Sequence, residues 1–170
     1  YVTFATRFTS SLTVGRDEAR FPKWIGRPDF VRGYNREDIS AIGCTGLPSD
    51  SGQSCSASEL IGSRVAFANA ELRFPLLRRY GNRTNLLGGF PPIDGLFFYD
   101  AGVAWSKGQS VQFSRPENLN VDTQRGVLQS YGFGIRMNLF NIAVIRWDWA
   151  VPVSRPNARG FGTWFFGASY

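Results

Sequence analysis

Apolar and polar residues alternate along six segments of the chain. Residues of one parity are apolar and residues of the other are small or polar, which is the period of β-strands whose two faces meet different surroundings. Between Val65 and Leu76, for example, the second face carries Asn69, Glu71 and Arg73. The segments are Tyr1–Val14, Val65–Leu76, Leu96–Trp105, Ser130–Leu139, Asn141–Val153 and Gly162–Tyr170. Together they predict an all-β fold.

Two architectures fit such strands, a soluble sandwich or barrel with its apolar face inside and a transmembrane barrel with its apolar face in lipid. The apolar faces end in aromatic residues such as Trp105, Tyr131 and Trp164, as interfacial girdles do. The segments also exceed the usual length of soluble strands. A slip of one residue would place Arg136 and Arg146 in lipid, at about 2–4 kcal/mol for each arginine at the midplane. We therefore expect an antiparallel transmembrane β-barrel, with a soluble sandwich as the alternative.

The lengths of the connections indicate which strand ends face the cell exterior. The first connection, Gly15–Arg64, and the third, Ser106–Gln129, are long, whereas only a few residues near Phe140 separate the fourth and fifth strands. Outer-membrane barrels have long external loops and short periplasmic turns. With the C-terminus in the periplasm, we expect residues 15–64 to form a long external loop, although Leu77–Gly95 is long for a periplasmic turn.

Six strands are too few to close a membrane barrel, because single-chain barrels start at eight strands. An open sheet edge in lipid would leave backbone groups without hydrogen bonds. Tyr1 is not a methionine and already lies within a strand-like run. We therefore expect residues 1–170 to be the C-terminal portion of a larger barrel, without its N-terminal strands and any periplasmic domain.

Composition narrows the classes of function. The 170 residues are 43% hydrophobic, 15% aromatic and only 19% charged, and no apolar run is long enough for a transmembrane helix. The absence of histidine excludes Ser-His-Asp and Cys-His nucleophile systems and histidine-ligated metals. The net charge of +6 is scattered along the chain, which argues against nucleic-acid binding. We expect no catalytic residues, no metal and no cofactor.

The two cysteines, Cys44 and Cys55, lie in one segment rich in glycine and serine. Without histidine or further cysteine, they are too few ligands for a zinc site. We favour a local disulfide, which forms in an oxidising compartment, and two free thiols are the alternative. An external position of residues 15–64 agrees with the disulfide.

Four short motifs follow one another along the chain. They are Phe30-Val31-Arg32-Gly33-Tyr34, Glu71-Leu72-Arg73-Phe74-Pro75, Phe98-Tyr99-Asp100-Ala101-Gly102 and Gly167-Ala168-Ser169-Tyr170. In this order they resemble the V-R-G-F/Y, E-x-x-x-P, F-x-D-x-G and closing G-x-x-aromatic motifs of the bacterial surface antigen family. This is the outer-membrane assembly and translocation superfamily typified by BamA, which includes TamA and the two-partner secretion translocators. The resemblance covers nearly the whole chain and implies the last six strands of a sixteen-stranded barrel.

The resemblance also implies a role for the loop motif. In the family the sixth external loop folds back into the barrel, and its arginine pairs with acidic residues of the two strand motifs. The corresponding residues here are Val31, Arg32, Gly33 and Tyr34 in the loop, with Glu71 and Asp100 as lumen partners. Two carboxylates in a confined interior need a cation, and one guanidinium can bridge them. Gly33 would let the loop turn tightly or approach the wall, against which Tyr34 would pack.

A different pairing of the same charges is the alternative. Arg32 would then be a solvated loop residue, and the two carboxylates would pair with arginines on the strands. The candidate arginines are Arg73, Arg136 and Arg146.

A location and a function follow from the same resemblance. It implies the bacterial outer membrane, with lipid, unfolded or nascent outer-membrane polypeptides, and periplasmic or lipoprotein accessory subunits as partners. We expect the protein to aid insertion or passage of polypeptides without catalysing a bond change. Gly167 and Tyr170 would belong to the C-terminal signal by which such barrels are recognised. The alternatives are a barrel that anchors or exports a different N-terminal domain, a passive pore, and an outer-membrane enzyme.

Overall fold

The structure is a computed structural model that describes most of the chain. The described residues are 2–16, 18, 20, 22–27, 29–34, 57–77, 91–113, 123–139, 142–153 and 160–168. Cys44, Cys55 and Tyr170 lie outside them, and so do the predicted disulfide and the end of the predicted C-terminal signal. Within the described ranges, no helix is long and apolar enough to cross a membrane.

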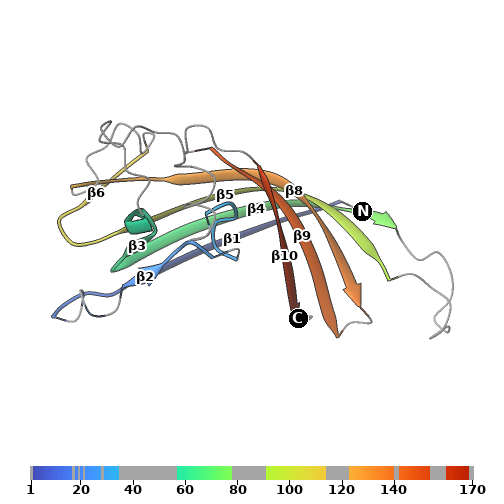
Figure 1. Ribbon diagram of the computed structural model, residues 1–170, viewed down its shortest axis with the longest axis horizontal. Helices are drawn as coiled ribbons and strands as arrows, with labels where there is room; N and C mark the ends of the chain where they lie inside the picture. The colour runs from blue at the N-terminus through green and yellow to red at the C-terminus, as the bar shows by residue number, and fades with distance from the viewer. Residues whose placement is uncertain are drawn as a thin grey trace.

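In this part of the chain, six long strands form one antiparallel sheet that curves strongly along its length (Figure 1). They pair in the order β1, β4, β5, β8, β9 and β10, so each strand lies beside its predecessor among the six. The bounds are β1 Thr3–Leu12, β4 Arg64–Leu77, β5 Ile93–Trp105, β8 Leu128–Leu139, β9 Ala143–Pro152 and β10 Phe161–Ala168. The prediction of an all-β fold with antiparallel strands is confirmed, with one strand for each alternating segment.

One face of the sheet, here called the outer face, presents large apolar side chains to the surroundings. Phe8 is 73% exposed, Phe97 56% and Trp164 73%. The same face also exposes Phe4, Leu72, Tyr99, Tyr131, Phe133, Ile135 and Phe166. So many exposed large apolar side chains on one face fit contact with lipid and are rare on soluble monomers.

The opposite face, here called the inner face, carries buried polar side chains. Asp100 and Ser130 are fully buried there, and Asn69, Glu71 and Asp148 are almost so. The alternation of the sequence predicted these two faces, because successive side chains of a strand point to opposite sides of the sheet.

An apolar core lies between the inner face and a loop segment, residues 22–27 and 29–34, that crosses it. Ile25, Val31 and Tyr34 of this segment are fully buried. The remaining members of the cluster are Leu60, Val65, Phe67, Ala104 and Leu128. Burial of one such large side chain contributes about 1.5–3 kcal/mol, so this core fixes the segment to the sheet.

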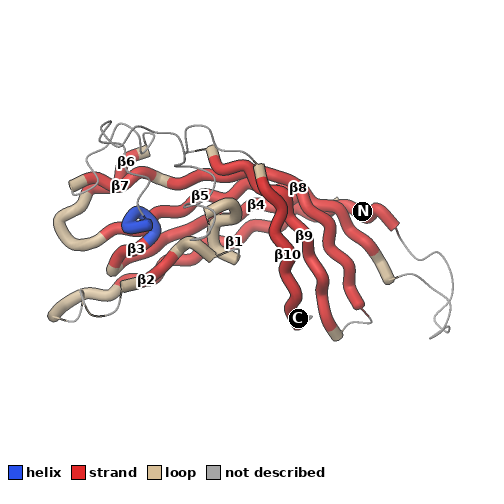
Figure 2. The backbone as a smooth tube through the Cα atoms, in the orientation of Figure 1, coloured by secondary structure: helices blue, strands red, loops and turns tan. Residues whose placement is uncertain are grey.

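The long connections contain short elements that the alternation did not predict. Figure 2 shows them gathered at one end of the main sheet. They are β2 (Lys23–Trp24), the 3₁₀ helix η2 (Ala57–Leu60), β3 (Ile61–Gly62), β6 (Ser110–Gln112) and β7 (Gln124–Gly126). β2 pairs with β3 in antiparallel fashion, and β6 pairs with β7 in parallel. Strands of two or three residues are too short to produce a recognisable period, which is why the sequence shows only connections there.

Glu18 joins three segments of the connections at this end of the sheet. One carboxylate oxygen, Oε1, accepts a hydrogen bond of 2.6 Å from the Ser63 hydroxyl and one of 3.0 Å from the backbone N–H of Lys107. The guanidinium of Arg64 lies 3.5 Å from the same oxygen. The segment after β1, the turn before β4 and the turn after β5 are therefore held together by one carboxylate.

Among the described strands, β1 and β10 are the two edges of the main sheet. β1 pairs with β4, and β10 pairs with β9. The other side of each edge strand carries backbone N–H and C=O groups that have no partner strand in the described sheet. Such edges attract further strands, and a membrane requires them to be paired.

Candidate functional site

The segment that carries the loop motif is fixed to the inner face before the motif begins. The backbone N–H of Ile25 donates to the carbonyl of Leu60 at 2.9 Å, next to the β2–β3 ladder. The Phe30 ring stacks on Phe67 of β4 with their centroids 4.5 Å apart, and the Asn69 amide donates to the Phe30 carbonyl at 2.7 Å. These contacts place Arg32 over the buried part of the inner face.

After Arg32, Gly33 and Tyr34 hold the segment close to the inner face of the sheet. Gly33 has φ +90°, a left-handed conformation that glycine adopts without strain, and a Cβ at this position would lie 3.4 Å from the Ala150 side chain. Tyr34 is fully buried, and its hydroxyl donates to the backbone carbonyl of Gln129 at 2.7 Å. The loop therefore contacts β9 and β8 as well as β4.

Arg32 binds Asp100 of β5 through three groups. Its Nε donates to Oδ2 at 2.6 Å, its Nη2 donates to Oδ1 at 2.8 Å, and its backbone N–H donates to Oδ2 at 3.2 Å. Asp100 is fully buried and Arg32 is 5% exposed. The two parallel side-chain bonds form the planar fork that arginine makes with a carboxylate, which fixes direction as well as distance.

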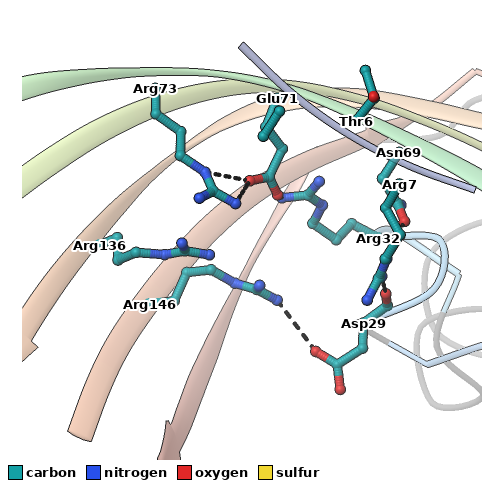
Figure 3. A pocket seen from close by; sticks show the side chains of 10 residues that line it. Thr6, Arg7, Asp29, Arg32, Asn69, Glu71, Arg73, Arg136 and Arg146 are labelled. Atoms are coloured by element: carbon teal, nitrogen blue, oxygen red, sulfur yellow. Dashed lines mark hydrogen bonds and ion pairs between the residues drawn. The ribbon is translucent and has the colours of Figure 1, made fainter. Parts of the chain in front are cut away.

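Two more carboxylates face the same guanidinium. Arg32 Nη1 lies 3.0 Å from Glu71 Oε1 of β4 and 3.7 Å from Asp148 Oδ2 of β9. Figure 3 shows Arg32 extending from the loop toward Glu71. The structure thus brings together the loop arginine and both acidic residues that the motifs singled out, and it adds Asp148.

Strand arginines also pair with these carboxylates, as the alternative arrangement supposed. Arg73 donates to Glu71 Oε2 through Nε at 2.9 Å and through Nη2 at 2.7 Å. Arg146 Nε lies 2.7 Å from Asp148 Oδ2. Glu71 and Asp148 therefore interact both with the loop and with arginines of the strands, whereas Asp100 accepts hydrogen bonds from Arg32 and Asn69.

The remaining positions of the strand motif on β5 also contact the loop. The Phe98 ring lies under Arg32, with the guanidinium carbon 3.6 Å from the ring centroid, a cation–π contact. Gly102 lies against Val31, because a Cβ at Gly102 would come within 2.5 Å of a Val31 methyl group. Phe98, Asp100 and Gly102 thus meet one loop through stacking, charge and close approach.

Asn69 extends this network toward β1. Its amide donates to Asp100 Oδ1 at 2.8 Å, and its carbonyl oxygen accepts a hydrogen bond of 3.0 Å from Arg7 Nε. Arg7 also donates to the backbone carbonyl of Asp29 in the loop. The sequence placed Asn69 on the inner face, but it gave no sign of this bridging position, because alternation says nothing of distances between strands.

Burial and charge act in opposite directions on Arg32. Burial acts to lower the pKa of the guanidinium, but the hydrogen bonds and charge of Asp100 and the charges of Glu71 and Asp148 outweigh it and raise the pKa. Arg32 therefore stays protonated. Removal of one partner from a buried ion pair costs about 3–5 kcal/mol, because the other charge is left uncompensated.

The arrangement is suited to holding a loop. Glu71, Asp100 and Asp148 each have an arginine partner within 4.0 Å. In the described ranges, no group of three or more cysteine or acidic residues is placed to hold a metal ion. Gly167, one of the two residues of the predicted C-terminal signal, lies on β10 opposite Val144 of β9.

Comparison with known proteins supplies one match. The family model of the Omp85 superfamily domain matches residues 20–170, which is most of the chain and includes the loop segment, β4, β5 and the three following long strands. No curated protein and no solved structure was found to match the chain.

Proposed function

The chain belongs to the Omp85 superfamily of outer-membrane proteins, and we propose that residues 1–170 are the C-terminal portion of a transmembrane β-barrel that aids insertion or passage of polypeptides. The family acts in protein insertion and translocation at the outer membrane. Lipid, unfolded or nascent outer-membrane polypeptides and periplasmic or lipoprotein accessory subunits are the proposed partners. The protein would change no covalent bond.

The faces and edges of the sheet support a barrel. Large apolar side chains such as Phe8 and Trp164 are exposed on the outer face, whereas the carboxylates Glu71, Asp100 and Asp148 are buried on the inner face. The open edges β1 and β10 would leave backbone groups unpaired in lipid, so a membrane-embedded form needs further strands between them. Sixteen strands in total are the number that the family resemblance implies.

The contact between Arg32 and Asp100 is the observation that carries the proposal. It anchors the loop on the inner face, in the space through which an open pore would have to conduct ions. A loop fixed inside the barrel favours a protein that guides polypeptides over a passive pore. The involvement of Glu71, Asp100 and Asp148 in ion pairs argues against their use as general acids or bases.

Reconstitution of the full-length protein tests the proposal. In liposomes, the protein should accelerate the folding of a small outer-membrane barrel substrate. The folded product is measured by its resistance to protease. Arg32→Ala should reduce this acceleration, because the loop loses its anchor, and Arg16→Ala, at an exposed position outside the site, should not.

Two results would contradict the proposal. One is a correctly inserted protein that leaves substrate folding unchanged and instead shows large, steady conductance in planar bilayers, as a passive pore does. The other is full activity of an Arg32→Ala protein whose folding and heat-modifiability are also unchanged.

A further inference from the structure

A second cluster of charges lies on the inner face beside the Arg32 site. Arg73 of β4, Arg136 of β8 and Arg146 of β9 converge on a half-open cavity of about 180 Å³ (Figure 3). Five arginines but only two carboxylates line this cavity. They are Arg7, Arg32, Arg73, Arg136 and Arg146, with Asp29 and Glu71. Arginines therefore outnumber carboxylates in the lining, although Arg32, Arg73 and Arg146 each have a carboxylate partner.

Arg136 is the residue at which this excess is located. No carboxylate in the described ranges forms an ion pair with it, and its buried Nε has no hydrogen-bond partner. Asp94 is its register partner on β5, yet the two side chains form no ion pair. In contrast, Arg73 is paired with Glu71, and Arg146 with Asp148.

The strand register makes the position of Arg136 unfavourable without a counter-charge. Arg136 lies directly opposite Arg146 in the β8–β9 ladder, on the same face. Like charges in directly opposite positions destabilise a sheet, and partial burial strengthens their repulsion. A buried N–H donor without an acceptor, such as Nε of Arg136, also destabilises the folded state. A group with several acceptor oxygens and more than one negative charge would remove both penalties.

We infer that Arg73, Arg136 and Arg146 bind a phosphate group in this cavity. Guanidinium groups match phosphate oxygens with paired hydrogen bonds, and a tetrahedral phosphate offers acceptors to three arginines at once. The cavity is smaller than the roughly 300–1,000 Å³ of sites for drug-sized ligands, which suits a single phosphate group. The group could belong to a free phosphate or to a lipid headgroup. Binding at this site does not depend on the proposed polypeptide-inserting activity.

Thermal unfolding of the full-length protein in dodecyl maltoside tests this inference. In chloride buffer, Arg136→Gln should unfold at the same temperature as the wild type or higher, because one repelling charge is gone. Addition of inorganic phosphate should raise the unfolding temperature of the wild type but not that of Arg136→Gln. Arg136→Lys, which keeps the charge, should retain part of the increase. Arg16→Gln removes one exposed arginine outside the cavity and should behave as the wild type.

Titration calorimetry then separates the two sources of phosphate. Inorganic phosphate should bind the detergent-solubilised wild type, and Arg136→Gln should weaken this binding about tenfold or more. If a headgroup is the source, the same difference should appear with phosphatidylglycerol vesicles and not with vesicles of an uncharged glycolipid. Either result supports the site.

A competing occupant would give a different pattern. If an acidic side chain from outside the described residues fills the cavity, phosphate and phosphatidylglycerol will not shift the wild type. Arg136→Gln will then unfold at a lower temperature in chloride buffer, because it leaves that acid unpaired. This pattern, or equal phosphate stabilisation of the wild type and Arg136→Gln, would overturn the inference.

Discussion

Gly102 shows how the absence of one Cβ atom on β5 allows the loop to pack against the sheet. The residue lies two positions after Asp100, and the Val31 side chain occupies the space where its Cβ would be. The Arg32–Asp100 bonds are 2.6 and 2.8 Å long, so the loop has little freedom to withdraw from the wall without losing them. Close packing at Gly102 and charge pairing at Asp100 are therefore coupled through the backbone of two adjacent loop residues.

Gly102→Ala should destabilise the full-length protein by about 1–3 kcal/mol, because the added methyl group overpacks against Val31. Chemical unfolding of the detergent-solubilised protein measures this change. The double variant Gly102→Ala with Val31→Ala should recover part of the loss, since the smaller loop side chain makes room. Ala101→Val adds volume on the outer face beside Gly102 and should be nearly neutral. Equal effects of Gly102→Ala and Ala101→Val would show that the loop does not seat against β5 in this way.

Single-residue contacts were predictable only where a motif carried them. Arg32, Glu71 and Asp100 could be placed near one another because the family resemblance supplies their relation. Asp148 lies on the inner face by alternation, but its approach to Arg32 depends on the lateral distance from β5 to β9, which no spacing along the chain encodes. The bridging position of Asn69 was missed for the same reason.

At the scale of elements, the two faces of each strand were the most predictable feature. The period of two is maintained over 8 to 14 residues per long strand, so a slip would exchange apolar and charged faces at many positions together. Strand ends were less predictable. β5 begins at Ile93, before the Leu96 expected from the pattern, because Asp94 and Gly95 are compatible with the ladder but do not mark it as apolar.

Phe97 tests the assignment of the outer face to lipid. Phe97→Arg should destabilise the protein in lipid vesicles by about 2–4 kcal/mol if the position lies near the midplane, because a charged side chain then enters hydrocarbon. Phe97→Leu should have a much smaller effect. Urea titration of the full-length protein in vesicles, read by tryptophan fluorescence, provides the measurement. An arginine variant as stable as the leucine variant would place this face in water.

Glu18 predicts a pH effect at the end of the sheet where the short elements gather. The hydrogen bond from Ser63, followed by the charge of Arg64, lowers the pKa of Glu18 below its ordinary value of about 4.3 in an unfolded chain. A carboxylate of this kind stabilises the folded state above the unfolded pKa, and the contribution disappears as pH falls through the lower folded pKa.

The difference in unfolding temperature between the wild type and Glu18→Gln isolates this contribution from that of other acidic residues. The difference should be present at pH 7 and should shrink toward zero as the pH is lowered past the folded pKa. Glu18→Gln is a suitable comparison because the amide can still accept a hydrogen bond but does not titrate. A difference that stays constant with pH would mean that the charge of Glu18 does not tie the connections together.

At the scale of the whole molecule, the apolar core and the charged site belong to the same contact between loop and sheet. Ile25, Val31 and Tyr34 bury apolar surface against the wall, and Arg32 lies among them with three carboxylates. The general architecture could be predicted because alternation, loop lengths and motifs agree. The docking geometry could not, because it depends on contacts between segments far apart in the chain.

A double-mutant cycle between Arg32 and Asp100 in the full-length protein tests the loop anchor most directly. The free energy of unfolding in lipid vesicles would be measured for the wild type, Arg32→Gln, Asp100→Asn and the double variant. Because their hydrogen bonds are charge-assisted, we predict a coupling energy of at least about 1.5 kcal/mol, with each single variant clearly destabilised. Additive effects within about 0.5 kcal/mol would contradict the account, since the loop arginine and the strand carboxylate would then act independently.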